Sequence, residues 1–331
     1  MRPPEFWYQT EGREAAYMLR TLLAPFSWIY ARATAKRIKT TVPFDPLIPV
    51  ICVGNASVGG TGKTPIAAYL LESLTRMGMR AVILSRGYGG TEKGPMVVGK
   101  KHTAADVGDE PLLLSRKGPV WVSIARDDGA KAAASHGAQV IIMDDGHQNP
   151  LVKKTLSLLV VDAEIGFGND RVIPAGPLRE PSETALARAD AIILMKPTPD
   201  FKTDEDLLAR FKGKPMVSAS LVSKMEPPSG KLYAFAGIGR PNKFFDALRR
   251  AGGDVVEGLS YADHHAYKDT DMMDLIELSR EYDAQLITTE KDYVRVPKSF
   301  QQHVLPWPVH VQFEDELTLR RLLHPIVSTV K

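Results

Sequence analysis

Short apolar runs rich in branched residues alternate along the chain with segments whose apolar positions recur every three to four residues. The run 46–53 is typical of a strand buried on both faces, and 65–77, after a glycine-rich turn, has helical spacing. Further runs of the first kind are 80–84, 120–124, 139–143, 157–161, 191–195 and 216–221. Strands that alternate with helices predict βαβ crossovers, and therefore an α/β fold with a mostly parallel sheet.

A linker by composition, 224–231 (KMEPPSGK), divides the chain after this series. Beyond it we expect strands at 232–236 and 284–288, helices at 241–251 and 270–283, and a strand at 309–313 that returns toward the linker. The chain therefore divides into an amino-terminal amphipathic region (1–40), a larger α/β domain (41–223) and a smaller carboxyl-terminal α/β domain with linker strands (224–331).

The amino-terminal region has helical spacing that Pro25 breaks. Its longest charge-free run, 21–31, has 11 residues, well short of the ~20 needed to span a bilayer. The charged residues between 17 and 39 are all basic, namely Arg20, Arg32, Lys36, Arg37 and Lys39. A basic segment with Trp and Tyr suits the headgroup region of an anionic membrane, and the alternative is an amphipathic helix packed on the protein's own core.

Composition narrows the class of protein. The chain has 331 residues, 44% hydrophobic and 24% charged, which is ordinary for a globular protein of about two domains. Its 42 Lys and Arg against 39 Asp and Glu give a net charge of +3, too small for a nucleic-acid-wrapping protein, so we expect no nucleic-acid partner. The single cysteine, Cys52, excludes an intrachain disulfide and a cysteine-cluster zinc site, and indicates a reducing compartment.

The sharpest chemical signal is the segment 54–65 (GNASVGGTGKTP), placed between a predicted strand and a predicted helix. Glycines let backbone N–H groups converge on one anion, and the following helix adds its positive end. Lys63 would reach the β- and γ-phosphates of a nucleotide, and the Thr64 hydroxyl would bind Mg²⁺. The strict G-x-x-x-x-G-K-[ST] pattern is not met, because Ser57 stands at the first glycine, and the alternative is a glycine-rich turn with a surface lysine. The loop residues expected to hold the nucleotide are Ser57, Val58, Gly59, Gly60, Thr61, Gly62, Lys63 and Thr64.

A second polar cluster follows the apolar run 140–143. Asp144 and Asp145 stand at its carboxyl end, which is where ligands of open α/β sheets lie. An apolar strand that ends in acids is typical of P-loop enzymes that hold Mg²⁺ opposite the loop, and the alternative is a polar turn. Together with the glycine-rich loop, these residues predict a P-loop NTPase-like domain.

Other polar motifs have structural explanations when each is taken alone. Asp109 could cap a helix, and His264 could lie in a solvated turn. The segments 85–90 and 176–181 could be loops, and 288–292 (TTEKD) could cap a helix.

Taken together, these motifs resemble the tetraacyldisaccharide 4′-kinase (lipid A 4′-kinase) family. In order they are GNASVGGTGKTP, LSRGYGG, GDEP, DDGHQN, PAGPLREP, FAGIGRP, ADHHAY and TTEKD, and they span nearly the whole chain. The resemblance implies transfer of the γ-phosphate of ATP to the 4′-hydroxyl of tetraacyldisaccharide 1-phosphate, an acylated glucosamine disaccharide, to give lipid IVA. It also implies a monotopic enzyme at the cytoplasmic face of a Gram-negative inner membrane. One departure stands after the paired aspartates, where the family usually has Gly-Phe-Gln-His and this chain has Gly146-His147-Gln148-Asn149.

The resemblance assigns Asp109 as the base and His264 as its partner, in two domains that must close on each other. We count Lys63 and Asp145 with them as catalytic. The residues expected at Mg²⁺ are Thr64, Asp144, Asp145, Gln148 and Glu180. Arg126 and Arg179 are expected at the phosphates of ATP, because a guanidinium fits phosphate oxygens. Arg86, Tyr88 and Glu110 are expected at the acceptor, and we expect a monomer.

Two other functions stay open from the residues alone. One is a soluble P-loop ATPase, GTPase or small-molecule kinase, and the other is a membrane-surface module that uses nucleotide only as a switch. Guanine recognition is disfavoured, because 289–292 (TEKD) lacks the spacing of the Asn/Thr-Lys-x-Asp pattern that reads guanine.

Overall fold

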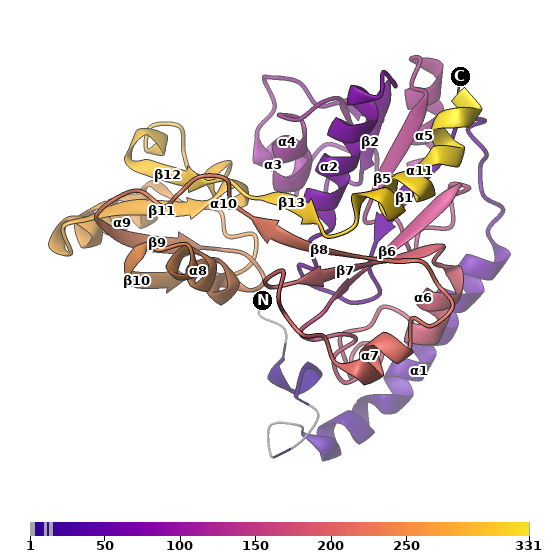
Figure 1. Cartoon of the computed structure of the whole chain (residues 1–331), viewed down its shortest axis with the longest axis horizontal. Helices are drawn as coiled ribbons and strands as arrows, with labels where there is room; N and C mark the ends of the chain where they lie inside the picture. Colours follow the sequence, from indigo (N-terminus) through magenta and orange to yellow (C-terminus); the bar gives the residue numbers. More distant parts are fainter. Residues whose placement is uncertain (1–3, 10–11, 13–15, 331) are drawn as a thin grey trace.

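The computed structural model describes residues 4–9, 12 and 16–330, and within them two sheets form the cores of two units (Figure 1). The larger sheet has the order β13-β8-β7-β6-β1-β5-β2-β4-β3, and neighbouring strands are parallel except β3 on β4 and β13 on β8. Its strands are β1 (Val50–Gly54), β2 (Ala81–Ser85), β3 (Met96–Val97), β4 (Val120–Val122), β5 (Val140–Asp144), β6 (Leu156–Asp162), β7 (Ala191–Lys196), β8 (Met216–Val222) and β13 (His310–Phe313). The predicted α/β fold with a mostly parallel sheet is confirmed.

Helices cover both faces of the larger sheet, which explains why its strands are apolar throughout. One face packs against α2 (Lys63–Arg76), α4 (Asp109–Leu114) and α11 (Glu316–Val330), and the other against α5 (Arg126–Ser135) and α6 (Ser182–Arg188). Successive residues of β1 serve opposite faces: Ile51 and Val53 belong to the core of α2, and Val50 belongs to that of α5. The short helices α3 (Ala104–Val107) and α7 (Glu205–Ala209) lie in the connections.

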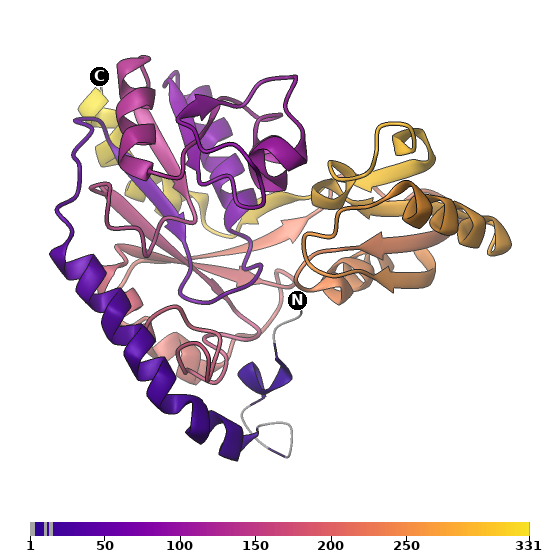
Figure 2. The ribbon, with the colours of Figure 1, turned by 180° about the vertical axis from the view of Figure 1, so that it is seen from behind.

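The smaller sheet is parallel, with the order β10-β9-β11-β12. Its strands are β9 (Lys231–Ala236), β10 (Asp254–Ser260), β11 (Ala284–Thr289) and β12 (Val304–Trp307). Phe244, Phe245 and Leu248 of α8 (Pro241–Arg250) cover one face, and Met272 and Leu275 of α9 (Asp269–Glu281) cover the other. The carboxyl ends of β9 and β11 point toward the larger unit (Figures 1 and 2), and α10 (Glu290–Tyr293) follows β11 there.

The carboxyl-terminal segment does not stay with the smaller sheet, although the sequence places all of 224–331 there. Val311 and Phe313 of β13 and Leu319 and Leu323 of α11 are buried in the core of α2. β13 pairs antiparallel with β8 at the edge of the larger sheet. The chain therefore leaves the larger unit at 224–231 and returns to it at β13, because the face beside α2 needs the apolar side of α11 to cover it.

The helix α1 (Tyr17–Thr40) runs along the outside of the larger unit and continues through Pro25, which the sequence predicts as a break (Figure 2). Its burial is inverted relative to an ordinary surface helix. The buried residues are polar, namely Arg20, Ser27 and Thr34. Up to residue 30 the exposed large side chains are apolar, namely Tyr17, Met18, Leu19, Leu22, Phe26, Trp28, Ile29 and Tyr30, and exposed basic residues follow them. Within the described residues, no helix is long and apolar enough to span a bilayer.

Candidate active site

The phosphate loop joins the carboxyl end of β1 to α2, and a second segment, 176–181, braces it. The Val58 N–H donates to the Pro177 carbonyl oxygen at 2.9 Å. The Arg179 N–H donates to the Ala56 carbonyl oxygen at 2.8 Å. These bonds place the Arg179 side chain beside the loop, where its guanidinium is positioned to bind an anionic ligand.

Asp145 lies between two cations that the sequence places in the site. Lys63 Nζ is 3.7 Å from Asp145 Oδ1, and Arg179 Nη1 donates to both carboxylate oxygens, at 3.0 and 2.9 Å. Burial raises the pKa of Asp145, but Lys63 and Arg179 outweigh burial and lower the pKa to about 2. Asp145 is therefore ionised and holds both cations at the mouth of the loop.

Asp144 ends β5 and is almost fully buried, and its Oδ1 has no hydrogen-bond partner among the described residues. Burial, Glu110 and Asp145 together raise the pKa of Asp144 to about 7. The buried Arg126 donates Nη2 to the main-chain oxygen of Asp144 at 3.3 Å, and burial lowers the pKa of Arg126 to about 10. A buried carboxylate with an open oxygen at this sheet edge is suited to a cation.

Other buried oxygen atoms around the loop also lack partners in the described part of the chain. They are Asn55 Oδ1, Thr61 Oγ1 and Gln148 Oε1. Carboxylate, amide and hydroxyl oxygens suit Mg²⁺, which usually takes one or two protein ligands and completes its shell with water and phosphate. No group of three His, Cys, Asp or Glu that could hold a metal occurs in 4–9, 12 and 16–330. The donor set therefore fits a Mg²⁺ ion shared with a nucleotide.

Glu180 does not present an open oxygen, although the sequence places it at the metal. Arg188 donates to its two oxygens at 2.5 and 2.6 Å, and Gln148 Nε2 donates to its Oε1 at 2.8 Å. Because both oxygens are engaged, Glu180 orients Gln148, and the unpaired Oε1 of Gln148 is the more available ligand.

Asp109 and His264 are 155 residues apart in the sequence, and the structure brings them together across the two units. His264 Nδ1 lies 2.9 Å from Asp109 Oδ2. Two cations of the smaller unit also face this carboxylate: Arg295 Nε is 3.5 Å from Asp109, and Lys291 Nζ is 3.9 Å from Asp109 and 3.0 Å from Glu110. Burial raises the pKa of Asp109, but the hydrogen bond with His264 and the charge of Lys291 bring it below its usual range.

Residues of the TTEKD motif hold in place the groups that contact the Asp109–His264 pair. Thr289 caps α10 by accepting from the Asp292 N–H at 3.0 Å, as the sequence suggests. Asp292 is fully buried and accepts from the Gly237 N–H, the Tyr267 hydroxyl and Arg295 Nη2, each at 2.8 Å. Asp292 thereby fixes Arg295, which lies three residues later, just beyond the end of α10, and for which the sequence offers no signal other than this spacing.

A second group of ion pairs joins the two units, and its residues were not predicted from the sequence. Arg240 donates to Asp162 at 3.1 Å and to Glu164 at 2.6 Å, and Lys243 Nζ is 2.7 Å from Asp162 and 3.1 Å from Glu164. In both contacts the smaller unit supplies cations and the larger unit supplies carboxylates. The FAGIGRP motif, which contains Arg240, was the available signal.

Of the residues expected at the acceptor, Tyr88 lies beside His264 and Glu110 is bonded to Asp109 through its N–H. Tyr88 is 68% exposed, and its ring meets the His264 ring edge-on with centroids 5.5 Å apart. Arg86 is exposed and close enough to Arg126 to lower its pKa. Tyr88 therefore lies beside the Asp109–His264 pair, whereas Arg86 lies near Arg126.

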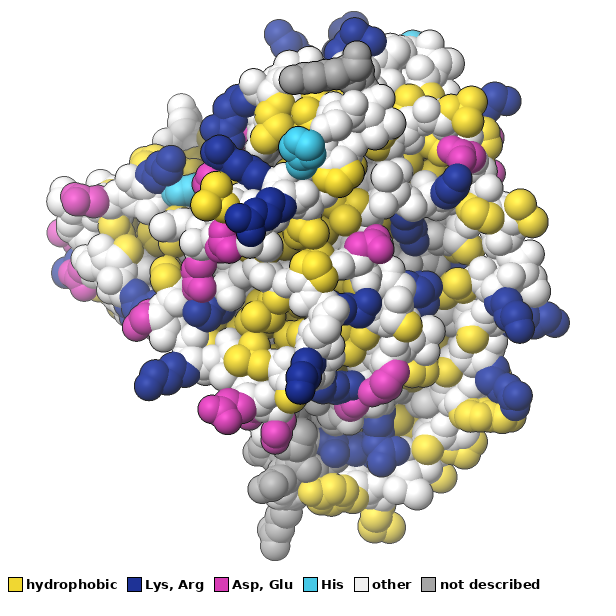
Figure 3. Space-filling model, turned by 45° about the vertical axis from the view of Figure 1, so that its right-hand side comes forward, with side chains coloured by type: hydrophobic (Ala, Val, Ile, Leu, Met, Phe, Trp, Pro, Cys, Tyr) yellow, Lys and Arg dark blue, Asp and Glu magenta, His cyan; other side chains and the backbone are white. Residues whose placement is uncertain are grey.

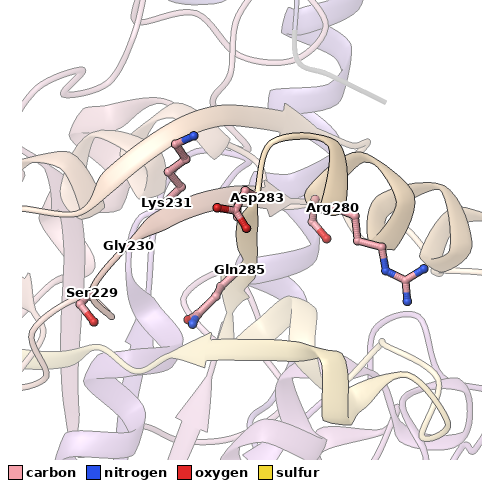
Figure 4. A pocket seen from close by; sticks show the side chains of 8 residues that line it. Ser229, Gly230, Lys231, Arg280, Asp283 and Gln285 are labelled. Carbon is pink, nitrogen blue, oxygen red and sulfur yellow. The ribbon is translucent and has the colours of Figure 1, made fainter.

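A pocket of 280 Å³ lies at the opposite end of the smaller sheet, where β9 and β11 begin. Figure 4 shows Lys231 and Arg280 pointing away from each other, with Asp283 between them. Because its cations do not converge, this pocket does not serve as a phosphate site.

His147, which departs from the family pattern, is a buried support for the loop. Its Nδ1 is 3.2 Å from Ser157 Oγ, and its Nε2 is 3.0 Å from the Ala185 carbonyl oxygen. Burial and the charge of Arg188 lower the pKa of His147 to about 4, so the ring is neutral. Its Cβ would lie 2.6 Å from a Cβ at Gly54, so only glycine fits at the end of β1.

Gly54→Ala is therefore expected to destabilise the protein by about 2–4 kcal/mol, because the new Cβ overlaps a packed backbone that cannot withdraw. Chemical denaturation followed by circular dichroism measures this loss. Gly99→Ala is the matched control, since nothing lies within 4 Å of a Cβ there. Equal stability of the two variants would show that His147 does not pack against β1 in this way.

Comparisons with known proteins find relatives over nearly the whole chain. The model of the family described as tetraacyldisaccharide-1-P 4′-kinase (LpxK) matches residues 19–327. The chain is 48% identical to the tetraacyldisaccharide 4′-kinase of Maricaulis maris (strain MCS10), over 99% of this chain and 97% of that one, and 48% identical to that of Caulobacter sp. (strain K31), over 98% of each. The solved structure of "apo" form LpxK from Aquifex aeolicus in complex with ATP superposes with a TM-score of 0.75 at 30% identity, covering 93% of this chain and 99% of that one.

Proposed function

The chain belongs to the tetraacyldisaccharide-1-P 4′-kinase family and is an ATP-dependent kinase that phosphorylates the 4′-hydroxyl of tetraacyldisaccharide 1-phosphate, and we propose that it does so where its two units meet. The matches do not favour a P-loop ATPase of another kind. Residues of one chain supply both sides of this site, so we also propose that a monomer suffices.

The observation that carries the site assignment is the Asp109–His264 contact of 2.9 Å beside the phosphate loop. A Cβ at Gly239 of the smaller unit would lie 3.6 Å from the Gly60 nitrogen and 3.5 Å from Asp263 Oδ2. Gly239 therefore lies between the tip of the loop and Asp263, the residue next to His264. An acceptor hydroxyl between His264 and this tip would have a proton acceptor on one side and the terminal phosphate of ATP on the other.

The reaction then needs one proton transfer and one displacement. Asp109 Oδ1 accepts from the Glu110 N–H at 2.9 Å and Oδ2 contacts His264 Nδ1, which leaves His264 Nε2, 3.8 Å from Asp263 Oδ1, as the ring nitrogen available to the acceptor. The 4′-hydroxyl proton passes to this pair while the hydroxyl oxygen bonds to the γ-phosphorus and the bond to the β,γ-bridging oxygen breaks, releasing ADP. Lys63 and Arg179 offset the charge that develops on the phosphate oxygens.

Thr64, Asp144 and Gln148 are the residues we propose to hold Mg²⁺, which when bound neutralises phosphate charge. Asp144→Asn keeps the shape of the side chain and removes its charge. The Mg²⁺ concentration that gives half the maximal transfer rate is expected to rise about tenfold or more. A magnesium titration of the rate tests this assignment, with Asp128→Asn on the exposed side of α5 as the control. Identical titrations for Asp144→Asn and the wild type would remove Asp144 from the metal site.

For α1 we propose that the inverted helix lies in the surface of the cytoplasmic leaflet of the inner membrane and brings the enzyme to its lipid substrate. The support is its exposed apolar residues and the basic residues that follow them, with Arg32 stacked 4.3 Å over the Trp28 ring. Hydrophobic and basic side chains lie together along the lower right edge of the molecule in Figure 3, the side on which Figure 1 labels α1. An exposed apolar surface of this kind is typical of a site that contacts a membrane or a partner.

Leu22→Glu with Phe26→Glu is therefore expected to weaken binding to anionic phospholipid vesicles by about tenfold or more, since both side chains are mostly exposed and would meet acyl chains. Sedimentation with the vesicles measures the bound fraction. Leu317→Glu on α11, exposed to a similar extent but outside α1, is the control. Unchanged binding of the double variant would contradict the role of α1.

A further inference from the structure

The segment before α1 is built into the larger unit. It lies outside the part of the chain that the family model matches, 19–327, and contains the short helix η1 (Glu5–Trp7). Trp7 Nε1 donates to the Pro174 carbonyl oxygen at 3.0 Å, and the Asn169 N–H donates to the Trp7 carbonyl oxygen at 2.8 Å. A Cβ at Gly168, whose φ is +62°, would lie 2.6 Å from that carbonyl oxygen. The segment is thus docked by directed hydrogen bonds on a surface that only glycine allows.

Arg20 ties the same segment to α1. Its guanidinium is buried and donates to the Phe6 carbonyl oxygen at 2.6 Å and to the Gln9 carbonyl oxygen. Asn169 Nδ2 also donates to Phe6, at 3.1 Å. Tyr8, which lies between these anchored residues, is therefore held in a defined position. In both ribbon views η1 is the indigo turn below the junction of the two units.

That position is the tip of the phosphate loop. A Cβ at Gly59 would lie 3.8 Å from the Tyr8 hydroxyl. Gly59 stands four residues before Lys63 and has a φ of +111°, which favours glycine, so the loop has no side chain of its own at this point. Burial raises the pKa of Tyr8, with Arg240 opposing and Asp162 adding to the rise, so the contact of the two units is close to this hydroxyl as well. The Tyr8 hydroxyl has no hydrogen-bond partner among the described residues.

We infer that the Tyr8 hydroxyl donates a hydrogen bond to the terminal phosphate of bound ATP, which makes the segment 4–9 a part of the nucleotide site. A phenol hydroxyl is a neutral donor on a rigid ring, and a phosphate oxygen is a strong acceptor. The tip of the loop is the side from which the β- and γ-phosphates are reached, whereas the adenosine end of the nucleotide lies farther away. The inference rests on the proposed nucleotide site and adds to it a donor that the family-matched region does not contain.

The test compares two nucleotides that differ in the γ-phosphate. Calorimetry with Mg²⁺ gives the affinities of the full-length protein for ADP and for a β,γ-methylene analogue of ATP. Tyr8→Phe removes only the hydroxyl, and we expect it to weaken binding of the analogue about tenfold while ADP binding changes less than about twofold. Tyr282→Phe, a half-exposed tyrosine at the far end of the smaller unit, is the matched control and should change neither affinity.

The other outcomes are equally definite. Equal weakening of both nucleotides by Tyr8→Phe would mean that Tyr8 only supports the loop, and no change for either would mean that it does not contact the nucleotide; each overturns the inference. A wild-type protein that binds neither nucleotide would instead overturn the nucleotide site itself. In the kinetic version of the test, the KM for ATP rises in Tyr8→Phe while the KM for the lipid acceptor stays the same.

Discussion

Lys63→Ala is expected to lower the rate of phosphate transfer at least about a thousandfold, because no other described cation occupies the first turn of α2 beside the loop. The fold should survive, since Asp145 keeps its two hydrogen bonds from Arg179 when Lys63 is removed. The rate is measured with labelled ATP and the lipid acceptor, and the fold by circular dichroism.

Lys153→Ala is the control, since Lys153 is exposed and pairs only with Asp45 in the described structure. Its activity should remain within about twofold of the wild type. A folded Lys63→Ala protein with near-normal turnover would mean that the glycine-rich loop does not hold the phosphates of ATP.

Asp109→Ala and His264→Ala are expected to lower kcat by about a thousandfold and a hundredfold, because proton transfer by a positioned group contributes on this scale. Since the two side chains share one hydrogen bond of 2.9 Å, the double variant should lose about as much as Asp109→Ala alone. The rates of the four proteins at saturating ATP form a double-mutant cycle.

His265→Ala supplies the control for this cycle. His265 neighbours His264 but contacts Asp271 at 3.0 Å, away from Asp109. Its effect should multiply with that of Asp109→Ala. If the Asp109 and His264 effects also multiply in full, the two residues do not act as a pair.

The parts of the site that could be predicted from sequence are those carried by local patterns. The phosphate loop needs glycines directly before a helix, and Asp144 and Asp145 follow directly from an apolar strand, so adjacent residues identify both. The parallel sheet follows for a similar reason, because strands covered on both faces are apolar throughout.

Long-range contacts could not be predicted in this way. The return of β13 and α11 to the larger sheet depends on which face is left uncovered, and that is a property of the assembled core. Arg295 and Lys291 reach Asp109 only because Asp292 and the end of β11 place them there. Glu180 carries the acidic side chain expected of a metal ligand, but Arg188, eight residues later, engages both of its oxygens.

The activity that underlies all these roles is transfer of the γ-phosphate of ATP onto a sugar hydroxyl of an acylated acceptor. The most direct measurement incubates the full-length protein with Mg²⁺, γ-labelled ATP and tetraacyldisaccharide 1-phosphate and separates the products by thin-layer chromatography. We expect the label in a lipid that carries one more phosphate than the acceptor, and no such product with Lys63→Ala. Label that appears only as inorganic phosphate, with the acceptor unchanged, would contradict phosphate transfer to the lipid.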